Sequence, residues 1–222
     1  MVFDGSPKVR LRTEGGRELA TRIWRLSAPM LGISSAPLGG GIGRRQWVLN
    51  AQVLPDYDCD DPQGDLQVLA GAARLAGAGA GMMTAVDVRR ASVVRQEGIY
   101  VDATVGVSGP QWAAAADGGD RRDDPPPVAE VGTINMLIVL PERLSEGALV
   151  NAVGTATEAK TQALWEAGVG GTGTATDALC LLCLIDGAPH PYGGPRSTWG
   201  SRLARAVHLA VLSGCAPPVP PA

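Results

Sequence analysis

Three side chains in the second half of the sequence could act as acids or bases. Glu158 and Lys160 belong to the segment GTATEAK, and Asp177 ends the glycine- and threonine-rich segment GGTGTATD. Hydrolysis of an amide needs a group that activates the nucleophile and a group that protonates the leaving amine, and carboxylates and lysines can fill both roles. The same residues are also typical of a solvated helix face and of a turn. Residue types alone leave both interpretations open.

Two further segments are rich in glycine and small polar side chains. They are SSAPLGGG at 34–41 and GTIN at 132–135. Each stands beside a predicted strand end, where α/β proteins build ligand pockets. The glycines of GGGIG at 39–43 lack the Lys-Ser or Lys-Thr ending of a phosphate-binding loop, and they precede a strand. They therefore favour a turn whose backbone approaches a ligand over a nucleotide site.

The histidines and cysteines argue against a protein-bound metal. His190 and His208 are the two histidines of the chain, and the sequence contains neither HxH nor HExxH. A zinc hydrolase normally brings two or three histidines together. Cys180 and Cys183 form a CxxC pair within ALCLLCLID, a predicted buried strand on which residues three apart point to opposite faces. No GxSxG segment occurs either, so a hydrolase is predicted to use a carboxylate or a lysine, with no metal and no cofactor.

Composition excludes several classes of partner. The 222-residue chain is 45% hydrophobic and carries a net charge of −3 without any dense run of Lys and Arg. Nucleic-acid binding requires a basic footprint and is not expected. The N-terminus has charges where a signal peptide would be apolar, and the longest apolar runs are too short to cross a bilayer. We expect a cytoplasmic protein without membrane contact, and a homo-oligomer is left open.

The hydrophobic pattern predicts a single domain of the α/β or α+β class, with a mixed β-sheet and helices packed on it. Asp61 and Pro62 are typical of a helix start, Gly168 is typical of a helix end, and QEG at 96–98 is typical of a hairpin turn. Extended segments are predicted at 17–37, 46–53, 91–96, 99–108, 133–141 and 178–186, and helices at 64–77, 145–168 and 201–214.

The domain boundaries follow from composition. Residues 1–16 are expected to be a flexible N-terminus, 17–213 the domain, and 214–222 a proline-rich disordered tail. Residues 113–130 combine Gly-Gly, an acidic bias and three consecutive prolines. They are expected to form an exposed, mobile loop.

Helix geometry constrains the candidate acid–base groups. Glu158 and Lys160 are two residues apart, so they diverge by about 200° on an ideal helix. We expect the helix to begin late, near Thr157, with GTAT as a loop and the helix N-terminus directed at the substrate. Glu158, Lys160 and Asp177 would then converge with Asn135 and the glycines at 39–41.

The ordered set of short motifs resembles the adenosylcobinamide amidohydrolase family over about residues 30–212. The matching pieces are SSAPLGGG with Asn50, Tyr57 and Pro62, GMMTA at 81–85, GVS at 106–108, GTIN, ATEAK, GTGTATDA, and the YGG and WG pieces at 192–200. The chain departs from the family pattern after GVS, where it reads GPQWAAAADGGD. The resemblance implies cleavage of the amide that joins the aminopropanol arm to the corrin ring, giving adenosylcobyric acid for cobalamin salvage. The cobalt belongs to the substrate.

A corrinoid is large, flat and fringed with amides, so its recognition calls for many neutral donors and acceptors. The candidate catalytic residues are Glu158, Lys160, Asp177 and Asn135. Asn135, Thr133 and backbone N–H groups near Gly132 or Gly173 are the candidates for holding the oxyanion. The candidate substrate-binding residues are Ser34, Ser35, Gly39, Gly40, Gly41, Asn50, Thr84, Thr133, Thr157, Thr174 and Thr176.

The sequence leaves the nucleophile open between water and a Thr or Ser hydroxyl. Two alternatives to a corrinoid amidohydrolase remain. One is a non-catalytic corrinoid- or nucleotide-binding protein. The other is a hydrolase that cleaves its own chain at a Gly-Thr bond and uses the freed residue as its nucleophile.

Overall fold

The computed structural model describes residues 3, 5–115 and 132–216. They form a single mixed α/β domain, as the sequence predicted. Its elements in chain order are β1 (Lys8–Glu14), β2 (Arg17–Ser34), β3 (Gly41–Gln52), α1 (Pro62–Ala72), β4 (Gly79–Thr84), the short 3-10 helix η1 (Val88–Arg90), β5 (Ser92–Gln96), β6 (Ile99–Val105), β7 (Ile134–Val139), α2 (Glu146–Glu166), β8 (Ala178–Cys183) and α3 (Thr198–Cys215).

The described strands form one eight-stranded sheet in the order β4-β3-β2-β8-β7-β6-β5, with β1 paired to the first half of β2. Strands β3 and β4 are parallel, as are β7 and β8, and the other pairs are antiparallel. The register of β2 against β3 shifts between Arg25 and Met30. Pro29 lies within this stretch, and a proline has no N–H to donate to the ladder. The sheet therefore bends here and folds back on itself.

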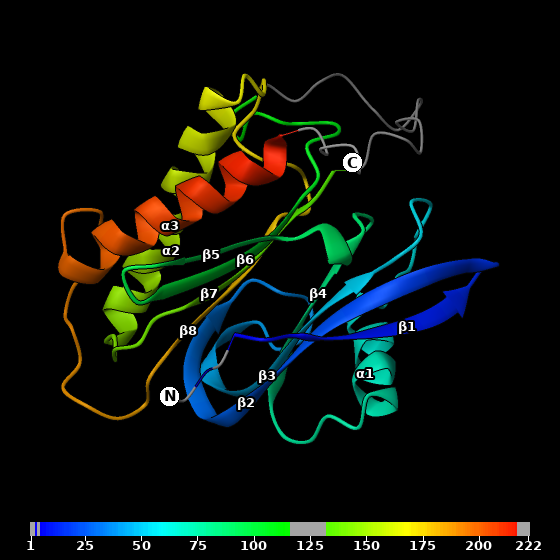
Figure 1. Ribbon diagram of the computed structural model, residues 1–222, viewed down its shortest axis with the longest axis horizontal. Helices are drawn as coiled ribbons and strands as arrows, with labels where there is room; N and C mark the ends of the chain where they lie inside the picture. The colour runs from blue at the N-terminus through cyan, green and yellow to red at the C-terminus, as the bar shows by residue number, and fades with distance from the viewer. Residues whose placement is uncertain (1–2, 4, 116–131, 217–222) are drawn as a thin grey trace, which may run out of the picture.

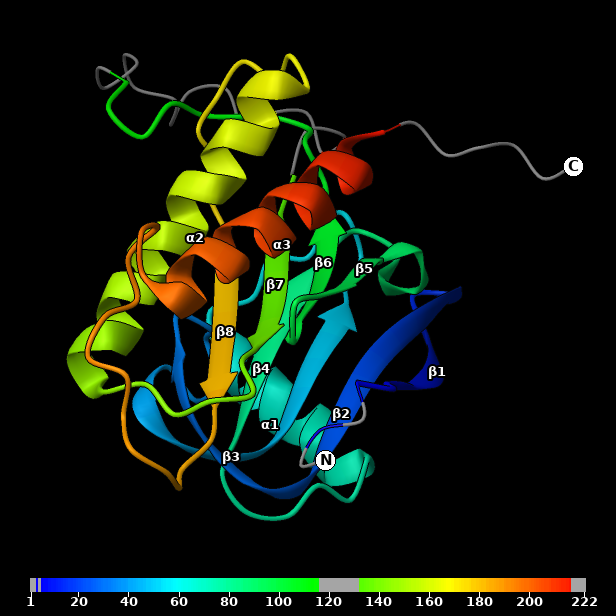
Figure 2. The same cartoon turned by 60° about the vertical axis from the view of Figure 1, so that its left-hand side comes forward.

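The bend produces four layers (Figures 1 and 2). Helix α1 covers the outer face of the half made of β1–β4, and helices α2 and α3 cover the outer face of the half made of β5–β8. A third apolar cluster, which includes Trp24, Met82, Leu137 and Leu182, fills the space between the two halves. Residues at the inner face of β3 can therefore contact those of β6 and β7, although these strands are not neighbours in the sheet.

Local signals in the sequence placed several element ends correctly. The Asp61 side chain accepts a hydrogen bond from the N–H of Gly64 at the start of α1, and the Ser145 side chain does the same for Ala148 at the start of α2. Gly168 follows the end of α2 with φ of 73°, a conformation that glycine adopts without strain. Glu97 and Gly98 turn the β5–β6 hairpin with positive φ.

The structure differs from the prediction at both ends of the domain and at β4. Residues Lys8–Glu14 form a strand paired with β2, so they are not a flexible N-terminus. Helix α3 continues to Cys215, beyond the predicted domain end at 213. Strand β4, GAGMMT, was not predicted because three of its six residues are Gly or Ala, which weakens the strand signal. Helix α1 ends at Ala72, before the predicted 77.

The two buried cysteines confirm the strand interpretation of CxxC. Cys180 belongs to the cluster between the sheet halves, and Cys183 to the cluster beneath α2 and α3. They lie on opposite faces of β8, and burial raises the pKa of the Cys180 thiol to about 12.

Two further findings concern the described residues alone. No described helix is long and apolar enough to cross a membrane. Most of the predicted loop at 113–130 lies outside the described residues, and within them residues 113–115 are exposed.

Candidate active site

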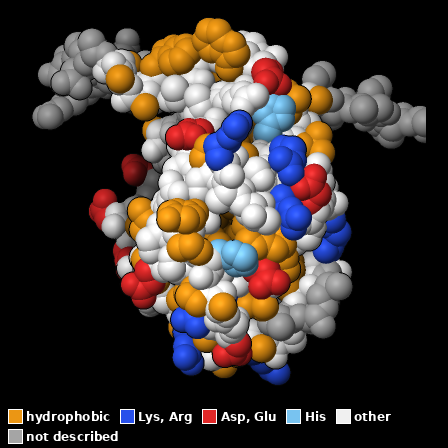
Figure 3. Space-filling model, turned by 90° about the vertical axis from the view of Figure 1, so that its left-hand side faces the viewer, with side chains coloured by type: hydrophobic (Ala, Val, Ile, Leu, Met, Phe, Trp, Pro, Cys, Tyr) orange, Lys and Arg blue, Asp and Glu red, His pale blue; other side chains and the backbone are white. Residues whose placement is uncertain are grey.

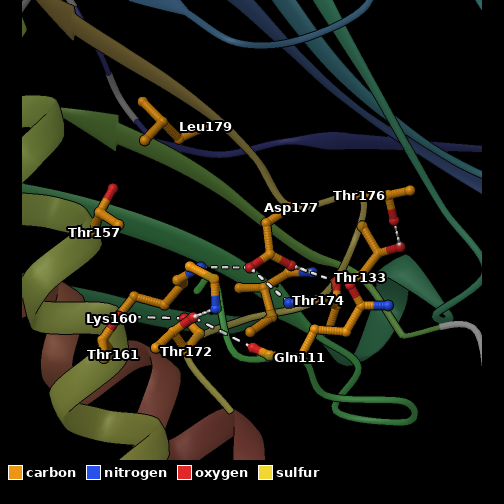
Figure 4. A network of polar contacts seen from close by, with 12 residues as sticks. Gln111, Thr133, Thr157, Lys160, Thr161, Thr172, Thr174, Thr176, Asp177 and Leu179 are labelled. Carbon is orange, nitrogen blue, oxygen red and sulfur yellow. Dashed lines mark hydrogen bonds and ion pairs between the residues drawn. The ribbon is translucent and has the colours of Figure 1, made fainter. Parts of the chain in front are cut away.

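Asp177 organises a polar network where β7 and β8 begin (Figure 4). Its Oδ2 atom accepts hydrogen bonds from the Lys160 Nζ at 2.5 Å and from the Thr174 N–H at 3.2 Å. Its Oδ1 atom accepts from the Thr174 hydroxyl at 2.5 Å and from the Ile134 N–H at 2.9 Å. A carboxylate offers about four acceptor positions, so this one is fully engaged. It ties the turn before β8 to the first residue of β7 and to helix α2.

Lys160 and Asp177 form a largely desolvated ion pair. The Lys160 side chain is 9% exposed and the Asp177 side chain 16%. An ion pair in such surroundings is much stronger electrostatically than one at the surface, and removing either partner leaves an uncompensated charge. The sequence prediction that these two residues converge is confirmed.

Glycine 173 makes the ion pair sterically feasible. A Cβ atom there would lie 2.4 Å from the Asp177 Oδ2 and 2.5 Å from the Lys160 Nζ. The turn is held from outside by the segment at Gln111, whose N–H donates to the Gly173 carbonyl and whose carbonyl accepts from the Thr172 N–H, both at 2.8 Å. The glycine-rich turn therefore gives room for the cation, and the role of backbone N–H groups near Gly173 in holding an oxyanion stays a prediction.

Helix α2 corrects the predicted geometry around Glu158. The helix is unbroken from Glu146 to Glu166, so it does not begin near Thr157. Because the helix is regular, Lys160 faces the sheet while Thr157 and Glu158 are exposed. The Thr157 hydroxyl donates to the Val153 carbonyl, as an exposed helical threonine can. The prediction that Glu158 converges with Lys160, Asp177 and Asn135 is therefore wrong.

Glu158 lies instead in a shallow hollow between α2 and α3. This hollow has a volume of about 260 Å³ and includes Gln162, Arg205 and His208. Figure 3 shows this side of the molecule, where acidic, basic and apolar side chains are interspersed. The solvated-face interpretation is the one that fits Glu158.

Thr133 and Thr176 form a hydroxyl pair beside the Asp177 network. Their Oγ1 atoms are 2.7 Å apart. Thr133 immediately precedes β7 and is buried, whereas Thr176 is exposed. The Thr176 hydroxyl also lies 3.5 Å from the Gly132 carbonyl oxygen. The rim of the sheet thus presents one accessible and one buried hydroxyl next to a buried cation.

Asn50 and Asn135 meet between the two halves of the sheet. The Asn135 amide N–H₂ donates to the Asn50 Oδ1 at 3.0 Å and to the Met83 carbonyl at 2.7 Å. The Asn50 amide donates in turn to the Thr104 hydroxyl at 3.1 Å. Both N–H donors of Asn135 are therefore used, so its amide is oriented to accept a hydrogen bond and not to stabilise an oxyanion. Its Oδ1 is buried without a hydrogen-bond partner among the described residues.

The sequence pattern did not lead us to predict the row of polar residues on β6. Tyr100, Asp102 and Thr104 alternate along the strand, and all three face the interior between the sheet halves. Arg22 donates to Asp102, and the Tyr100 hydroxyl donates to the same carboxylate. Burial raises the pKa of Asp102 and outweighs the opposing effect of Arg22. Polar residues at every second position of an otherwise apolar strand are the signal that could have identified this row.

Three of the predicted substrate-binding residues, Ser34, Ser35 and Thr84, lie at or next to strand ends. The Ser34 hydroxyl donates to the Leu179 carbonyl, and the Leu179 N–H donates to the Ser35 hydroxyl, so both serines lie beside the start of β8. Thr84 ends β4 and is buried, and its hydroxyl accepts from the Val86 N–H.

The glycines at 39–41 do not join the Asp177 network in the structure. A Cβ on Gly39 would lie 2.0 Å from the Gly79 carbonyl, at the opposite end of β4 from Thr84. The Gly39 and Gly41 carbonyls accept from the Arg45 guanidinium. The predicted convergence of these glycines with Asn135 is wrong, because the close approach of their backbone is to β4.

A separate apolar hollow of about 540 Å³ lies at the far end of β7. Val139, Tyr100, Met30 and Phe3 contribute to its lining. It is therefore at the other end of the interior from Thr133 and Asn135. Among the described residues, no three His, Cys, Asp or Glu side chains gather as they would around a metal ion.

Residues 6–217 match the family described as adenosylcobinamide amidohydrolase. A protein of that name from Methanosarcina mazei is 31% identical over 189 residues, which cover 81% of this chain and 88% of the relative. A second protein of that name, from Halobacterium salinarum, is 33% identical over 134 residues, covering 59% of this chain and 55% of the relative.

Among solved structures, the PH0078 protein from Pyrococcus horikoshii OT3 aligns over 95% of this chain and 78% of its own, at 12% identity and a TM-score of 0.46.

Proposed function

Because the chain belongs to the adenosylcobinamide amidohydrolase family, we propose that it hydrolyses the amide between the aminopropanol arm and the corrin ring of adenosylcobinamide. The products are adenosylcobyric acid and aminopropanol, and the reaction serves cobalamin salvage. The single observation that carries the site assignment is the desolvated Lys160–Asp177 pair beside the hydroxyls of Thr133 and Thr176. It combines a fixed positive charge with candidate nucleophiles at one rim of the sheet.

The residues of this rim divide the chemistry among them. A Thr133 or Thr176 hydroxyl, or a water bound by them, attacks the amide carbonyl carbon, the C–N bond breaks, and the proton of the attacking hydroxyl or water passes to the leaving amine nitrogen. If a threonine attacks, water then hydrolyses the ester that forms. Lys160 provides positive charge for the oxyanion that develops, in a position that the protein has already desolvated. Asp177 accepts four hydrogen bonds, so its role is to hold Lys160 and the turn in place. It is a positioning residue and not the general base.

The surrounding neutral groups suit an amide-fringed substrate. Several neutral polar groups lie within this rim or beside the start of β8. They are Thr174, Thr176, Ser35 and the carbonyl of Gly132. Amides require both donors and acceptors, and hydroxyls supply either. Asn135 and Asn50 lie deeper and support the rim through hydrogen bonds between the sheet halves. We propose that they position β7 and do not touch the reacting amide.

The test is incubation of the purified chain with adenosylcobinamide and, separately, with adenosylcobalamin, followed by mass analysis of the corrinoids. We expect adenosylcobinamide to lose its aminopropanol arm. Tight binding of either corrinoid without any change in mass would instead identify a corrinoid-binding protein, and unchanged corrinoids without binding would reject both functions.

We also propose that the protein uses no metal of its own. The cobalt of the substrate is held by its corrin ring, and the proposed chemistry relies on Lys160 and on hydroxyl groups. Turnover is expected to be unaffected when the protein is dialysed against a strong chelator. Loss of turnover that zinc restores would contradict this proposal.

A further inference from the structure

We propose that the chain cleaves its own backbone between Gly132 and Thr133, which makes Thr133 a new N-terminal residue and the nucleophile of the site. Only one part of this inference rests on the proposed function, namely that Thr133, once freed, attacks the substrate amide. The cleavage itself involves no corrinoid and can be measured independently.

The first observation is the position of the Thr133 hydroxyl. Thr133 directly precedes β7 in the interior of the four-layer fold and is 4% exposed. Its Oγ1 atom lies 2.7 Å from that of Thr176, and the Thr176 hydroxyl can also donate, at 3.5 Å, to the carbonyl oxygen of Gly132. The hydroxyl that would attack the Gly132 carbonyl carbon and a hydrogen-bond donor to the oxygen of that carbonyl therefore belong to one hydrogen-bonded group.

The second observation is that the Gly132–Thr133 peptide is clamped on both sides. A Cβ at Gly132 would lie 2.2 Å from the Ser108 carbonyl oxygen and 2.6 Å from the Gly106 carbonyl oxygen, so only glycine fits there. On the other side, the Gly106 N–H donates to the Thr133 carbonyl at 3.0 Å. Fixing the reacting groups in this way removes much of the entropic cost of an intramolecular attack.

The third observation separates this site from the other Gly-Thr pairs of the sequence, at 154–155, 171–172 and 173–174. Their threonine hydroxyls are engaged away from the preceding carbonyl. Thr155 lies within helix α2 and its hydroxyl donates to the Gly193 carbonyl, the Thr172 hydroxyl donates to the Gln111 carbonyl, and the Thr174 hydroxyl donates to Asp177. Cleavage is therefore expected at Gly132–Thr133 alone.

The chemistry balances without any co-reactant except water. The Thr133 Oγ bonds to the Gly132 carbonyl carbon, the C–N bond breaks, and the hydroxyl proton passes to the released Thr133 nitrogen. The resulting ester is then hydrolysed, which leaves a carboxylate on Gly132 and restores the Thr133 hydroxyl. Nothing is oxidised or reduced, and the two chains together exceed the original mass by one water.

The freed amine completes the site for substrate hydrolysis. An N-terminal amine next to its own hydroxyl is a general base for that hydroxyl. The N–H of the next residue, Ile134, donates to Asp177, which pairs with Lys160. The neutral form of this amine can accept the Thr133 proton. The Thr133 oxygen then attacks the carbonyl carbon of the substrate amide, and the N-terminal amine passes the proton to the aminopropanol nitrogen as the C–N bond breaks. Water then hydrolyses the acyl-enzyme ester.

The experiment is intact-mass analysis of the purified full chain over time, together with sequencing of any new N-terminus. We expect fragments that end at Gly132 and begin at Thr133. Thr133→Ala is expected to remain a single chain, Thr133→Ser to cleave, and Glu158→Gln, an exposed change on α2, to cleave like the wild type. Folding of each variant is checked by circular dichroism.

Three results would overturn the inference. They are a wild-type chain that stays intact through incubation and substrate turnover, cleavage that persists in Thr133→Ala, and a folded Thr133→Ser that does not cleave. The outcome is distinguishable from that of the proposed function. An intact chain that hydrolyses adenosylcobinamide rejects only self-cleavage, and a cleaved chain that leaves all corrinoids unchanged rejects only the corrinoid reaction.

Discussion

Glu158 and Lys160 are two positions apart in sequence, yet the structure gives them opposite environments. Lys160 is buried against Asp177, whereas Glu158 is exposed in the hollow between α2 and α3. A regular helix imposes this divergence. Sequence reasoning recognised the geometric conflict but resolved it with a helix that began too late. The acid–base pair suggested by spacing is therefore a single buried cation and its carboxylate.

Lys160→Met and Glu158→Gln are expected to differ sharply in their effect on turnover. Loss of the buried cation should lower kcat for corrinoid amide hydrolysis by about 100-fold or more, as removal of a preorganised oxyanion group does. Glu158→Gln should leave kcat within about twofold, because its side chain lies outside the network. Steady-state kinetics on both variants measures this. Near-normal kcat in Lys160→Met would remove the lysine from the mechanism.

Several single residues were predictable and others were not. Asp177, Lys160, Thr133, Thr174 and Thr176 were all selected from the sequence because they lie in short polar segments beside strand ends, and the structure brings them together. The hydrogen-bonding direction of Asn135 could not be predicted. It depends on Asn50 and Met83, whose positions follow from the folding back of the sheet.

At the scale of elements, the turn between α2 and β8 determines where Lys160 can lie. Gly173 is packed against both partners of the ion pair, whereas a Cβ on the nearby Gly170 would meet nothing within 4 Å. Neither glycine is among those with positive φ. An alanine at Gly173 therefore tests whether the space beside the ion pair is needed. An alanine at Gly170 tests whether the turn tolerates alanine in general.

Gly173→Ala is expected to disrupt the ion pair and Gly170→Ala to be nearly neutral. The added methyl at 173 must displace Lys160 or Asp177, so we expect turnover to fall markedly and the free energy of unfolding to drop by about 1–3 kcal/mol. Denaturant unfolding and kinetics on the matched pair provide the measurement. Equal behaviour of the two variants would show that the space at Gly173 is not needed.

Strand β6 carries a second buried ion pair whose role differs from that of Lys160 and Asp177. Asp102 and Arg22 lie between the sheet halves, each with one buried polar atom that lacks a partner among the described residues. Their pairing joins β6 to β2, which are not adjacent in the sheet. Burial raises the pKa of the Asp102 carboxyl, so its protonated form is favoured more in the folded than in the unfolded chain.

Arg22→Met is expected to destabilise the fold by about 3–5 kcal/mol near neutral pH, because Asp102 then loses its counter-charge. A raised pKa means that the contribution of this carboxyl to stability is fully present below its ordinary value and is lost as pH rises through its value in the folded protein. The deficit of Arg22→Met should therefore be smaller near pH 4 than near pH 8. Thermal melts at both pH values measure this, with Arg22→Met/Asp102→Leu as the control that recovers most of the loss. A deficit that does not vary with pH would contradict the assignment.

At the scale of the whole molecule, the four-layer arrangement could be predicted only in class. The hydrophobic pattern predicted a mixed sheet with helices packed on it, and capping residues predicted the starts of α1 and α2 and the end of α2. The fold-back of the sheet follows from the interruption of β2 near Pro29 and from apolar contacts between distant strands. These contacts join residues far apart in sequence, so no local pattern contains them. Strand β1 was interpreted as a flexible end because its side chains are mostly exposed and its backbone pairs only with β2 among the described strands.

The fold-back also explains why the proposed site lies at one end of the interior. Polar residues of β3, β6 and β7 meet near the start of β7, while the interior toward Val139 is apolar and opens into the hollow of about 540 Å³. The Lys160–Asp177 pair and the threonine hydroxyls cover the polar end. We therefore propose that the corrinoid amide is hydrolysed at this rim and assign no chemistry to the far end.

The most direct test of this account is hydrolysis of adenosylcobinamide in water enriched in a heavy oxygen isotope, with both products quantified by mass spectrometry. We predict equal amounts of aminopropanol and adenosylcobyric acid, with one heavy oxygen in the new corrinoid carboxylate and none in the aminopropanol. Adenosylcobinamide that is recovered unchanged, or aminopropanol that carries the heavy oxygen, would contradict hydrolysis of this amide as the activity of the chain.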